Sequence, residues 1–468
     1  MSIREALLRE VEGVVGKENL LTSAEDLACY SYDATPLPSR PPEAVALPGS
    51  AEQVVRLIAL ASNEGLKVIP RGAGTNLSGG TLPVQGGLVL CLTRMNRILE
   101  LDRDNMTVTV EPGVVTSALH AAVESRGLFY PPDPASMNVS TIGGNVGECA
   151  GGLRGRKYGV TKDYVLGLEM VLPSGEVLVT GGKTVKNVAG YDLTRLMVGS
   201  EGTLGVFTRI ILKLIPMPEG KKTMLALYDS LERAASTVSS IIAQGIVPST
   251  LEFMDRVTVR CVADHTGVNM PRNAEAVLLI EVDGPKAAIE GEAARIVELC
   301  SREHALEVRV ARDAQEGLAL TLARRAAIPA LARLRPTIKL EDITVPPSKL
   351  PEMIAAISRA AAKHQVQVGT FGHAGDGNLH PTFLTDQRDA EEMKRVEATV
   401  KELFETAISL GGTISGEHGI GLSKIRYLPL QVGPSGMKVM RAIKTALDPK
   451  NLFNPGKVFL DSDTTTKP

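Results

Sequence analysis

Three glycine-rich segments in the first half of the chain limit the folds that it can adopt. They read PRGAGTNLSGG (70–80), PPDPASMNVSTIGGNVGECAGGLRGRKYG (131–159) and GGKTVKNVAGYDLTRLMVGSEGTLGV (181–206). Glycine lets a backbone turn sharply and approach a neighbour closely. Three such segments in one region indicate a backbone that approaches a large flat or charged cofactor in several places. A solenoid of tight turns is the competing interpretation, but no repeat of fixed period is present.

The first segment follows the strand-like stretch KVIP and could place backbone N–H groups around a phosphate. It contains neither the Walker A pattern nor the G-x-G-x-x-G fingerprint that opens a helix in dinucleotide-binding folds. On its own, a plain turn would explain it. The three segments together favour a cofactor.

The composition is that of an ordinary globular protein without nucleic-acid-binding character. The chain has 468 residues, enough for roughly three domains. Its net charge is −2, only 3% of its residues are aromatic and it has no Trp, so a basic surface or a platform for stacking bases is not expected. The N-terminal stretch MSIREALLREVEGVVGKENLL is charged and amphipathic, unlike a signal peptide, and no apolar run reaches the ~18 residues that span a bilayer. We expect a cytoplasmic protein with at most peripheral contact with the inner face of the membrane.

Secondary-structure patterns divide the chain near residue 220. Pro216, Pro218 and Gly220 interrupt the pattern there and predict a boundary. Beyond it, residues 223–312 predict the order β-α-β-β-α-β, which is typical of a ferredoxin-like domain.

Two of the seven histidines bracket a glycine-rich loop, GHAGDGNLHP (372–381). Gly375 and Gly377 disfavour a helix across this loop. We therefore expect a strand–turn–strand that brings the rings of His373 and His380 together.

A second segment of the same character, SGEHGIG (415–421), places Glu417 beside His418. Two neutral imidazoles and one carboxylate make a three-ligand set with an open position, which is typical of catalytic zinc. The same donors also suit Mn or Fe. The alternative is that His373 and His380 cap loops or lie in the core.

The five cysteines are far apart in the sequence and include no C-x-x-C pair or C-x-x-C-H motif. They are Cys29, Cys91, Cys149, Cys261 and Cys300. This inventory predicts neither a disulfide framework nor a self-contained iron–sulfur site. An iron–sulfur relay would have to come from another chain.

Six motifs, in order along the chain, resemble a known flavoprotein family. PRGAGTNLSGG, PPDPASMNVSTIGGNVGECAGG, GSEGTLGV, GHAGDGNLH, SGEHGIG and NPGK are similar to motifs of the FAD-linked D-2-hydroxy-acid dehydrogenases. This family includes the D-lactate dehydrogenases and the flavin subunit of glycolate oxidase, within the vanillyl-alcohol-oxidase superfamily. The resemblance implies an α+β fold with a two-subdomain FAD-binding domain (1–220), a ferredoxin-like cap that binds substrate (221–410) and a C-terminal segment that returns to the FAD domain (411–468). It implies oxidation of a small D-2-hydroxy acid, D-lactate or glycolate, to the 2-oxo acid.

The resemblance also implies which residues hold FAD. Contacts are expected along the pyrophosphate, the middle of the cofactor, the adenine-side loop and the flavin ring, from Arg71, Gly72, Ala73, Gly74, Thr75, Asn76, Gly79, Pro132, Asp133, Ser136, Gly143, Gly144, Asn145, Gly147, Glu201, Gly205, Val206 and Asn454. Some superfamily members tether FAD covalently through a His or Cys. The loop here has Thr75 and Asn76 rather than His, so we expect noncovalent FAD.

For the substrate side, the resemblance assigns the metal to His373, His380 and Glu417 and the acid–base role to His418. A divalent ion would act as Lewis acid and template for the hydroxyl and carboxylate groups of the substrate. Imidazole suits proton transfer because its pKa lies near neutral pH.

Cationic anchors for the substrate carboxylate are expected in the segment between the cap and the core. Arg324 and Lys339 stand fifteen residues apart, the spacing that the resemblance implies, and Arg can bind a carboxylate through two hydrogen bonds. Arg325 is a competing alignment, and a solvated helix face is the alternative for Arg324. Residues 326–328 are the apolar AAI, where relatives acting on dicarboxylates carry a further polar group, so a small monocarboxylate is favoured.

Two other functions compete with this interpretation. A metal hydrolase would use the same three ligands but would leave the glycine-rich segments unexplained. A non-redox flavoprotein of the same superfamily, such as an alkyl-glycerone-phosphate synthase, would bind FAD without oxidising a hydroxy acid. For the dehydrogenase, we expect a protein to accept the electrons, either an iron–sulfur subunit or electron-transfer flavoprotein.

Overall fold

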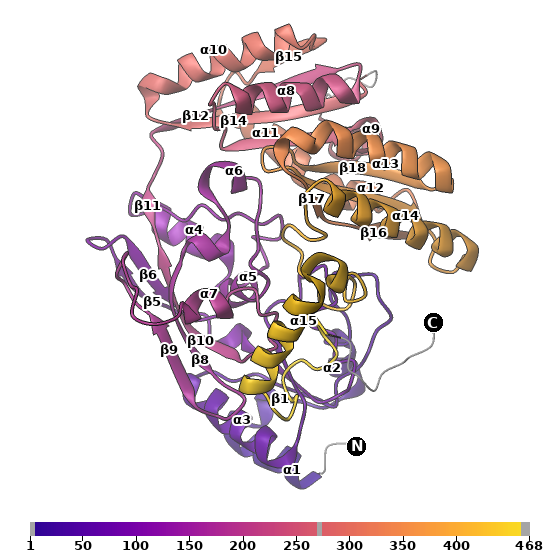
Figure 1. The fold of residues 1–468 in the computed structure, drawn as a ribbon. Coiled ribbons are helices and arrows are strands. Elements are labelled where there is room, and N and C mark those ends of the chain that lie inside the picture. Colours follow the sequence, from indigo (N-terminus) through magenta and orange to yellow (C-terminus); the bar gives the residue numbers. More distant parts are fainter. Residues whose placement is uncertain (1–4, 269–273, 460–468) are drawn as a thin grey trace.

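The computed structural model describes residues 5–268 and 274–459, which fold into two lobes. The N-terminal lobe is built on sheets of four and five strands, and the central lobe on one sheet of eight (Figure 1). After the central lobe, the chain returns to the N-terminal lobe through α15 (Leu428–Leu447), whose residues Ile443 and Leu447 pack against that lobe's core. Among the described residues, no helix is long and apolar enough to cross a membrane.

The four-stranded sheet forms the base of the N-terminal lobe. Its order is β1 (Leu20–Leu21), β2 (Ala44–Ala46), β4 (Leu88–Cys91) and β3 (Val68–Arg71), with β2, β4 and β3 parallel. The helices α1 (Glu5–Val15) and α3 (Ala51–Glu64) pack against it. The Ser50 hydroxyl accepts a hydrogen bond from the Gln53 N–H and so begins α3, and Gly65, with φ of 67°, ends it. The first glycine-rich segment therefore begins at the end of β3, the edge strand of this sheet.

The five-stranded sheet is antiparallel and carries the other two glycine-rich segments. Its order is β5 (Ile98–Asp102), β6 (Thr107–Val110), β10 (Val206–Lys213), β8 (Val165–Val171) and β9 (Val177–Gly181). The neighbouring helices are α4 (Thr116–Glu124), α5 (Ile142–Glu148) and α7 (Leu193–Met197). Shorter elements complete the lobe: α2 (Ala24–Cys29), β7 (Leu128–Phe129), α6 (Gly155–Tyr158) and β11 (Ile215–Pro216).

The central lobe confirms the ferredoxin-like prediction and extends it. Its first four strands lie in the order β15 (Glu307–Val310), β12 (Gly220–Tyr228), β14 (Ala276–Gly284) and β13 (Thr250–Asp255). The sheet continues through β18 (Gln367–His373), β19 (Asn378–Thr385) and β16 (Thr337–Leu340), and β17 (Ile343–Thr344) also pairs with β19. The hairpin of β18 and β19 is the strand–turn–strand predicted for the histidine loop, and it joins the sheet because β18 pairs with β13.

Helices cover both faces of the eight-stranded sheet. On one face lie α8 (Leu231–Ala243), α10 (Lys286–Arg302), α13 (Leu350–His364) and α14 (Ala390–Ser409). On the other lie α9 (Arg256–Thr266), α11 (Ala314–Arg325) and α12 (Ala327–Leu331). The sequence patterns did not predict α9, which is inserted between the second and third strands of the ferredoxin-like unit. The second helix layer faces the N-terminal lobe and brings Arg324 and Arg325 to the space between the lobes.

Candidate active site

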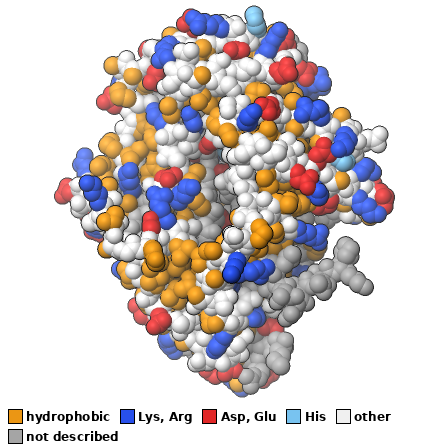
Figure 2. Space-filling model, viewed as in Figure 1, with side chains coloured by type: hydrophobic (Ala, Val, Ile, Leu, Met, Phe, Trp, Pro, Cys, Tyr) orange, Lys and Arg blue, Asp and Glu red, His pale blue; other side chains and the backbone are white. Residues whose placement is uncertain are grey.

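A cavity of about 550 Å³ lies where the two lobes meet. Figure 2 shows the surface hollowed between the lobes, in the same orientation as Figure 1. All three glycine-rich segments form one wall of the cavity, the glycine-rich wall. The histidine segments of the central lobe form the opposite wall, the histidine wall, and the end of α11 and the start of α12 complete the lining. A volume of this size is within the ~300–1,000 Å³ range of ligand pockets.

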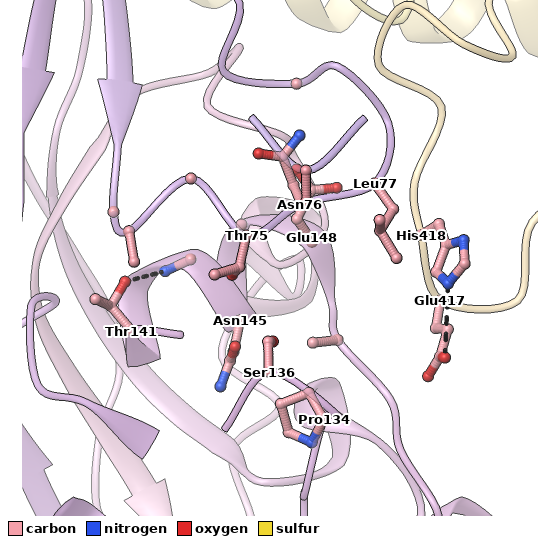
Figure 3. Close-up of a pocket in the computed structure, with 18 of the residues that line it drawn as sticks. Thr75, Asn76, Leu77, Pro134, Ser136, Thr141, Asn145, Glu148, Glu417 and His418 are labelled. Atoms are coloured by element: carbon pink, nitrogen blue, oxygen red, sulfur yellow. Dashed lines mark hydrogen bonds and ion pairs between the residues drawn. The ribbon is translucent and has the colours of Figure 1, made fainter. Parts of the chain in front are cut away.

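The glycines of α5 leave space for a ligand along one wall of this cavity. A Cβ added to Gly147 would meet no atom within 4 Å, and one added to Gly144 would meet only the hydroxyl of Thr141, at 3.2 Å. Both glycines line the cavity. The Thr141 hydroxyl begins α5 by accepting the Gly144 N–H at 3.3 Å (Figure 3). The open side of this helix therefore admits close approach by a cofactor, as the sequence predicts.

The loop after β3 contributes a second stretch of exposed backbone. Gly74 has a φ of 72°, and a Cβ on it would collide with the Arg71 guanidinium. The Arg71 side chain is buried and donates to the Thr81 hydroxyl at 3.1 Å. A buried arginine beside a glycine-rich backbone suits the anionic pyrophosphate that the resemblance implies for this loop.

Most of the residues predicted to hold FAD line the cavity. These are Arg71, Gly72, Ala73, Gly74, Thr75, Asn76, Ser136, Gly143, Gly144, Asn145, Gly147, Glu201, Gly205 and Val206. Figure 3 shows Thr75, Ser136 and Asn145 on one side of the space and Glu417 and His418 on the other.

Four of the predicted FAD residues are not among the lining residues, and each has a polar group bonded within the protein. The Asp133 carboxylate pairs with Arg325 at 2.5 Å, and the Pro132 carbonyl is 3.0 Å from a ring nitrogen of His120. The Asn454 amide donates to the carbonyls of Gly80 and Glu201, at 2.7 and 2.8 Å. The Gly79 N–H donates to the Thr35 hydroxyl at 2.8 Å. These residues shape the cavity from the second layer.

Glu148, which the sequence motifs did not single out, adds a carboxyl group to the wall. Its Oε2 is buried and has no hydrogen-bond partner among the described residues. Burial, together with nearby Glu201 and Asp33, raises the pKa of Glu148 well above its ordinary value. A neutral carboxyl with an unpaired oxygen fits a polar edge of a bound cofactor.

The two histidines and the glutamate that are predicted as metal ligands converge at the opposite wall. His373 Nε2 lies 3.3 Å from Glu417 Oε1, and His380 Nε2 lies 3.5 Å from the same oxygen. Ligand atoms about 2.1 Å from a tetrahedral ion would be roughly 3.4 Å apart, so this spacing fits one shared divalent cation. Asp342, His380 and His418 form a second group of converging donors on the other side of His380.

Burial and mutual contact set the charges in this cluster. Burial raises the pKa of Glu417, but the neighbouring imidazoles outweigh it and lower the pKa to about 2. Burial and nearby His418 lower the pKa of His380 to about 3, and burial also lowers the pKa of His418. Burial acts in the same direction on His373, but Glu252 and Glu417 raise the pKa of its ring well above the ordinary value. The carboxylates that flank His373 thus favour a positive charge between them, which a proton or a metal ion can supply.

His418 lies at the cavity wall, against the predicted metal ligands. Its ring stacks on that of His380, with centroids 5.1 Å apart, and its Nε2 lies 3.8 Å from Glu417 Oε1 (Figure 3). Its Nδ1 is buried and has no hydrogen-bond partner among the described residues, and the side chain lines the cavity.

Two buried carboxylates support this cluster, and sequence patterns did not identify either. Glu252 on β13 lies beside His373, with Oε1 2.7 Å from Nδ1. Asp342 accepts the backbone N–H groups of Gly416, Glu417 and His418 on one oxygen, at 2.8–2.9 Å. It therefore fixes the loop that carries Glu417 and His418.

The predicted substrate anchors have different surroundings. Arg324 and Arg325 both line the cavity, Arg324 paired with Glu252 and Arg325 with Asp133. Lys339 is not among the lining residues; its ammonium group pairs with Glu397 and lies 3.8 Å from Glu341. The structure therefore does not support Lys339 as a direct substrate ligand, because the residue does not line the cavity and its charge is already paired.

Comparison with known proteins identifies the family. The family model described as "FAD linked oxidases, C-terminal domain" matches residues 217–458, and the one described as "FAD binding domain" matches residues 42–181. The glycolate oxidase subunit GlcD of Bacillus subtilis (strain 168) is 52% identical over 457 residues, covering 98% of this chain and 96% of that protein. The chain belongs to the FAD-linked oxidase family. It is an FAD-linked oxidoreductase, as the six motifs predicted.

Other relatives agree with this membership, and solved structures share the fold. GlcD of Escherichia coli (strain K12) is 37% identical over 97% of this chain and 90% of that protein, and the D-lactate dehydrogenase of Anaerostipes hadrus is 36% identical over 89% of each. The structure of p-cresol methylhydroxylase superimposes with a TM-score of 0.81, covering 97% of this chain and 96% of that one at 18% identity. Alkyldihydroxyacetonephosphate synthase gives 0.77, covering 97% and 86% at 20% identity. The FAD-linked oxidase therefore has the vanillyl-alcohol-oxidase-type fold that the sequence predicts.

Proposed function

We propose that this FAD-linked oxidase oxidises a small D-2-hydroxy acid, glycolate or D-lactate, to the 2-oxo acid with the help of a divalent metal. One observation carries the proposal: the glycine-rich wall and the cluster of His373, His380, Glu417 and His418 line the same cavity. A hydroxy acid between them would touch both. The names of the relatives, glycolate oxidase subunit and D-lactate dehydrogenase, support the substrate class.

In this proposal, the chain's own residues bind and orient the reactants. The glycine-rich segments hold noncovalent FAD, which supplies the two-electron acceptor. His373, His380 and Glu417 hold a divalent ion, zinc or else Mn or Fe, which supplies Lewis acidity. The two histidines are buried, and this low exposure to water strengthens their electrostatic contacts with the ion and the substrate.

The proton of the substrate hydroxyl goes to His418. Its ring is stacked on His380 and so held in place, and its Nδ1 has no competing partner among the described residues. A neutral imidazole can accept a proton, and positioned bases of this kind contribute about 10²–10⁴-fold to rate. Burial, which lowers the pKa of His418, favours that neutral form.

The walls near the arginines favour a small monocarboxylate. Ile328, Pro329 and Leu340 line the cavity beside Arg324 and Arg325, so a second carboxylate would meet apolar surface. The test is anaerobic reduction of the bound flavin by a panel of acids. We expect glycolate and D-lactate to bleach the flavin and D-malate and D-2-hydroxyglutarate to do so far more slowly. Equal rates with the dicarboxylates would contradict the size limit, and no bleaching by any hydroxy acid would favour a non-redox flavoprotein.

We also propose that a separate protein accepts the electrons. The relatives from B. subtilis and E. coli are named as subunits, and the chain's five cysteines are dispersed in its sequence. The acceptor would be an iron–sulfur subunit or electron-transfer flavoprotein. Anaerobically reduced enzyme mixed with oxygen should reoxidise slowly compared with turnover. Rapid reoxidation by oxygen alone would make the enzyme an oxidase in the strict sense and refute this part of the proposal.

A further inference from the structure

The register of the central sheet places Glu252 next to the metal-ligand candidate His373. β13 and β18 are antiparallel, with Phe253 opposite Gly372 and Met254 opposite Phe371. The next pair along this register is Glu252 and His373, whose side chains are therefore cross-strand neighbours. Glu252 Oε1 lies 2.7 Å from His373 Nδ1, and Glu252 is fully buried. The contact is built into the sheet.

The other oxygen of Glu252 is occupied by an arginine. Glu252 Oε2 lies 2.6 Å from Arg324 Nη2, and both side chains are buried. The Arg324 guanidinium also lies over the ring of Phe371, 4.6 Å from its centroid. An isolated carboxylate would be costly among the apolar side chains of this core, and the paired guanidinium offsets that cost.

We propose that Glu252 and Arg324 are positioning residues that set the orientation and tautomer of His373. This inference rests on the metal site of the proposed function. If Glu252 accepts the Nδ1–H of His373, the lone pair of the ring is left on Nε2. That nitrogen points to Glu417 and His380, the other two proposed ligands. Carboxylate partners of this kind orient metal-binding histidines, and their loss lowers metal affinity or activity by about 10- to 100-fold.

The same geometry gives Arg324 a role other than the one that the family resemblance implies. Its guanidinium forms an ion pair with Glu252, so it acts on the site through Glu252 and His373. Arg324→Met should therefore weaken metal binding, which a residue that only anchors the substrate carboxylate would leave unchanged.

The test measures metal affinity of the FAD-loaded protein after chelator treatment, by zinc titration against a chromophoric competitor. Glu252→Gln and Arg324→Met should bind zinc about 10- to 100-fold more weakly than wild type while their flavin absorbance is unchanged. Glu281→Gln is the matched control. Glu281 lies on the adjacent strand β14, is buried and pairs with Lys221 at 3.1 Å, away from the histidines. The Glu281→Gln protein should bind zinc as tightly as wild type does.

A double variant separates positioning from a purely structural role. The double variant with Glu252→Leu and Arg324→Met removes both charges, so no unpaired buried charge is left to destabilise the folded protein. We expect a melting temperature near that of wild type and zinc binding that stays weak. Wild-type zinc affinity in this double variant, with normal FAD content, would overturn the positioning role. Absence of zinc, manganese and iron binding in the wild-type protein would instead refute the metal site, and the positioning role with it.

Discussion

The two walls of the cavity are suited to bind their ligands by different means. The glycine-rich wall offers backbone and empty space, and its key feature at Gly144 and Gly147 is the absence of a side chain. The histidine wall consists of side chains, and buried carboxylates behind it hold the His373 ring and the backbone that carries Glu417 and His418. A backbone wall should therefore fail when a side chain is added. The histidine wall should fail when a side chain is removed, even one that lies behind the site.

The largest expected effect is loss of FAD when a side chain is added to the glycine-rich wall. Gly147→Val adds a branched side chain at the cavity wall, where an added Cβ would meet no atom within 4 Å. We expect the purified variant to be folded and colourless, as measured by circular dichroism and flavin absorbance. Gly72→Val is less informative because its Cβ would collide with the Thr141 hydroxyl and could disturb the fold itself.

Gly291→Val is the matched control for Gly147→Val. Gly291 also lies in a helix, α10, with no atom within 4 Å of an added Cβ, but it is far from the cavity lining. It should keep the flavin. Normal FAD content in Gly147→Val would mean that the cofactor does not use this wall.

The next effect is loss of metal from the histidine wall. His380→Ala removes the imidazole that lies between the two groups of donors. We expect elemental analysis to find little bound metal and flavin reduction by substrate to slow by at least about 100-fold, while FAD stays bound. The control is His364→Ala, which removes a histidine at the end of α13 that is paired with Glu402 of α14. Full metal occupancy in His380→Ala would rule out the three-ligand set.

A smaller effect is expected when a buried carboxylate behind the histidine wall is changed. Asp342→Asn keeps the size of the side chain but loses the charge that accepts three backbone N–H groups of the 416–418 loop. Hydrogen bonds to a charged group contribute about 1.5–3 kcal/mol each, so the loop should loosen. We expect metal affinity to fall by about 10- to 100-fold with FAD retained, measured by the same titration. An unchanged affinity would show that the loop is held by other contacts.

The smallest effect is expected for Lys339→Ala. The lysine is paired with Glu397, whose side chain is half exposed, and it does not line the cavity. Such pairs contribute about 0–1 kcal/mol to stability. Steady-state kinetics with glycolate or D-lactate should show less than a threefold change in KM. A large rise in KM would restore the direct anchoring role that the sequence suggested.

The sequence predicts what depends on local pattern. The start and end of α3 follow from Ser50 and Gly65, and the β18–β19 hairpin follows from the glycines between the two histidines. The six motifs also identify the family and most of the lining residues, because those motifs are contiguous. The positive φ of Gly74 is one example of a local requirement that only glycine meets easily.

The second layer could not be predicted because it depends on strand register. Glu252 and His373 are 121 residues apart, and Asp342 and His418 are 76 apart. The only local signal is an acid inside the apolar strand STLEFM, a position where a buried charge requires a partner. The same limit explains why Lys339 and Asp133 were predicted to contact a ligand although both are paired within the protein. A motif shows that a charge is present but not which neighbour pairs with it.

The central claim is that both walls act in one reaction, and flavin reduction with and without metal tests it most directly. The enzyme is mixed anaerobically with glycolate or D-lactate in three forms: as purified, after chelator treatment, and after metal is restored. We expect rapid bleaching of the flavin in the first and third forms. The chelated form should keep its FAD but bleach at least about 100-fold more slowly, because the proposed Lewis acid is missing. Equally rapid bleaching of the metal-free enzyme would show that the histidine wall does not act in flavin reduction.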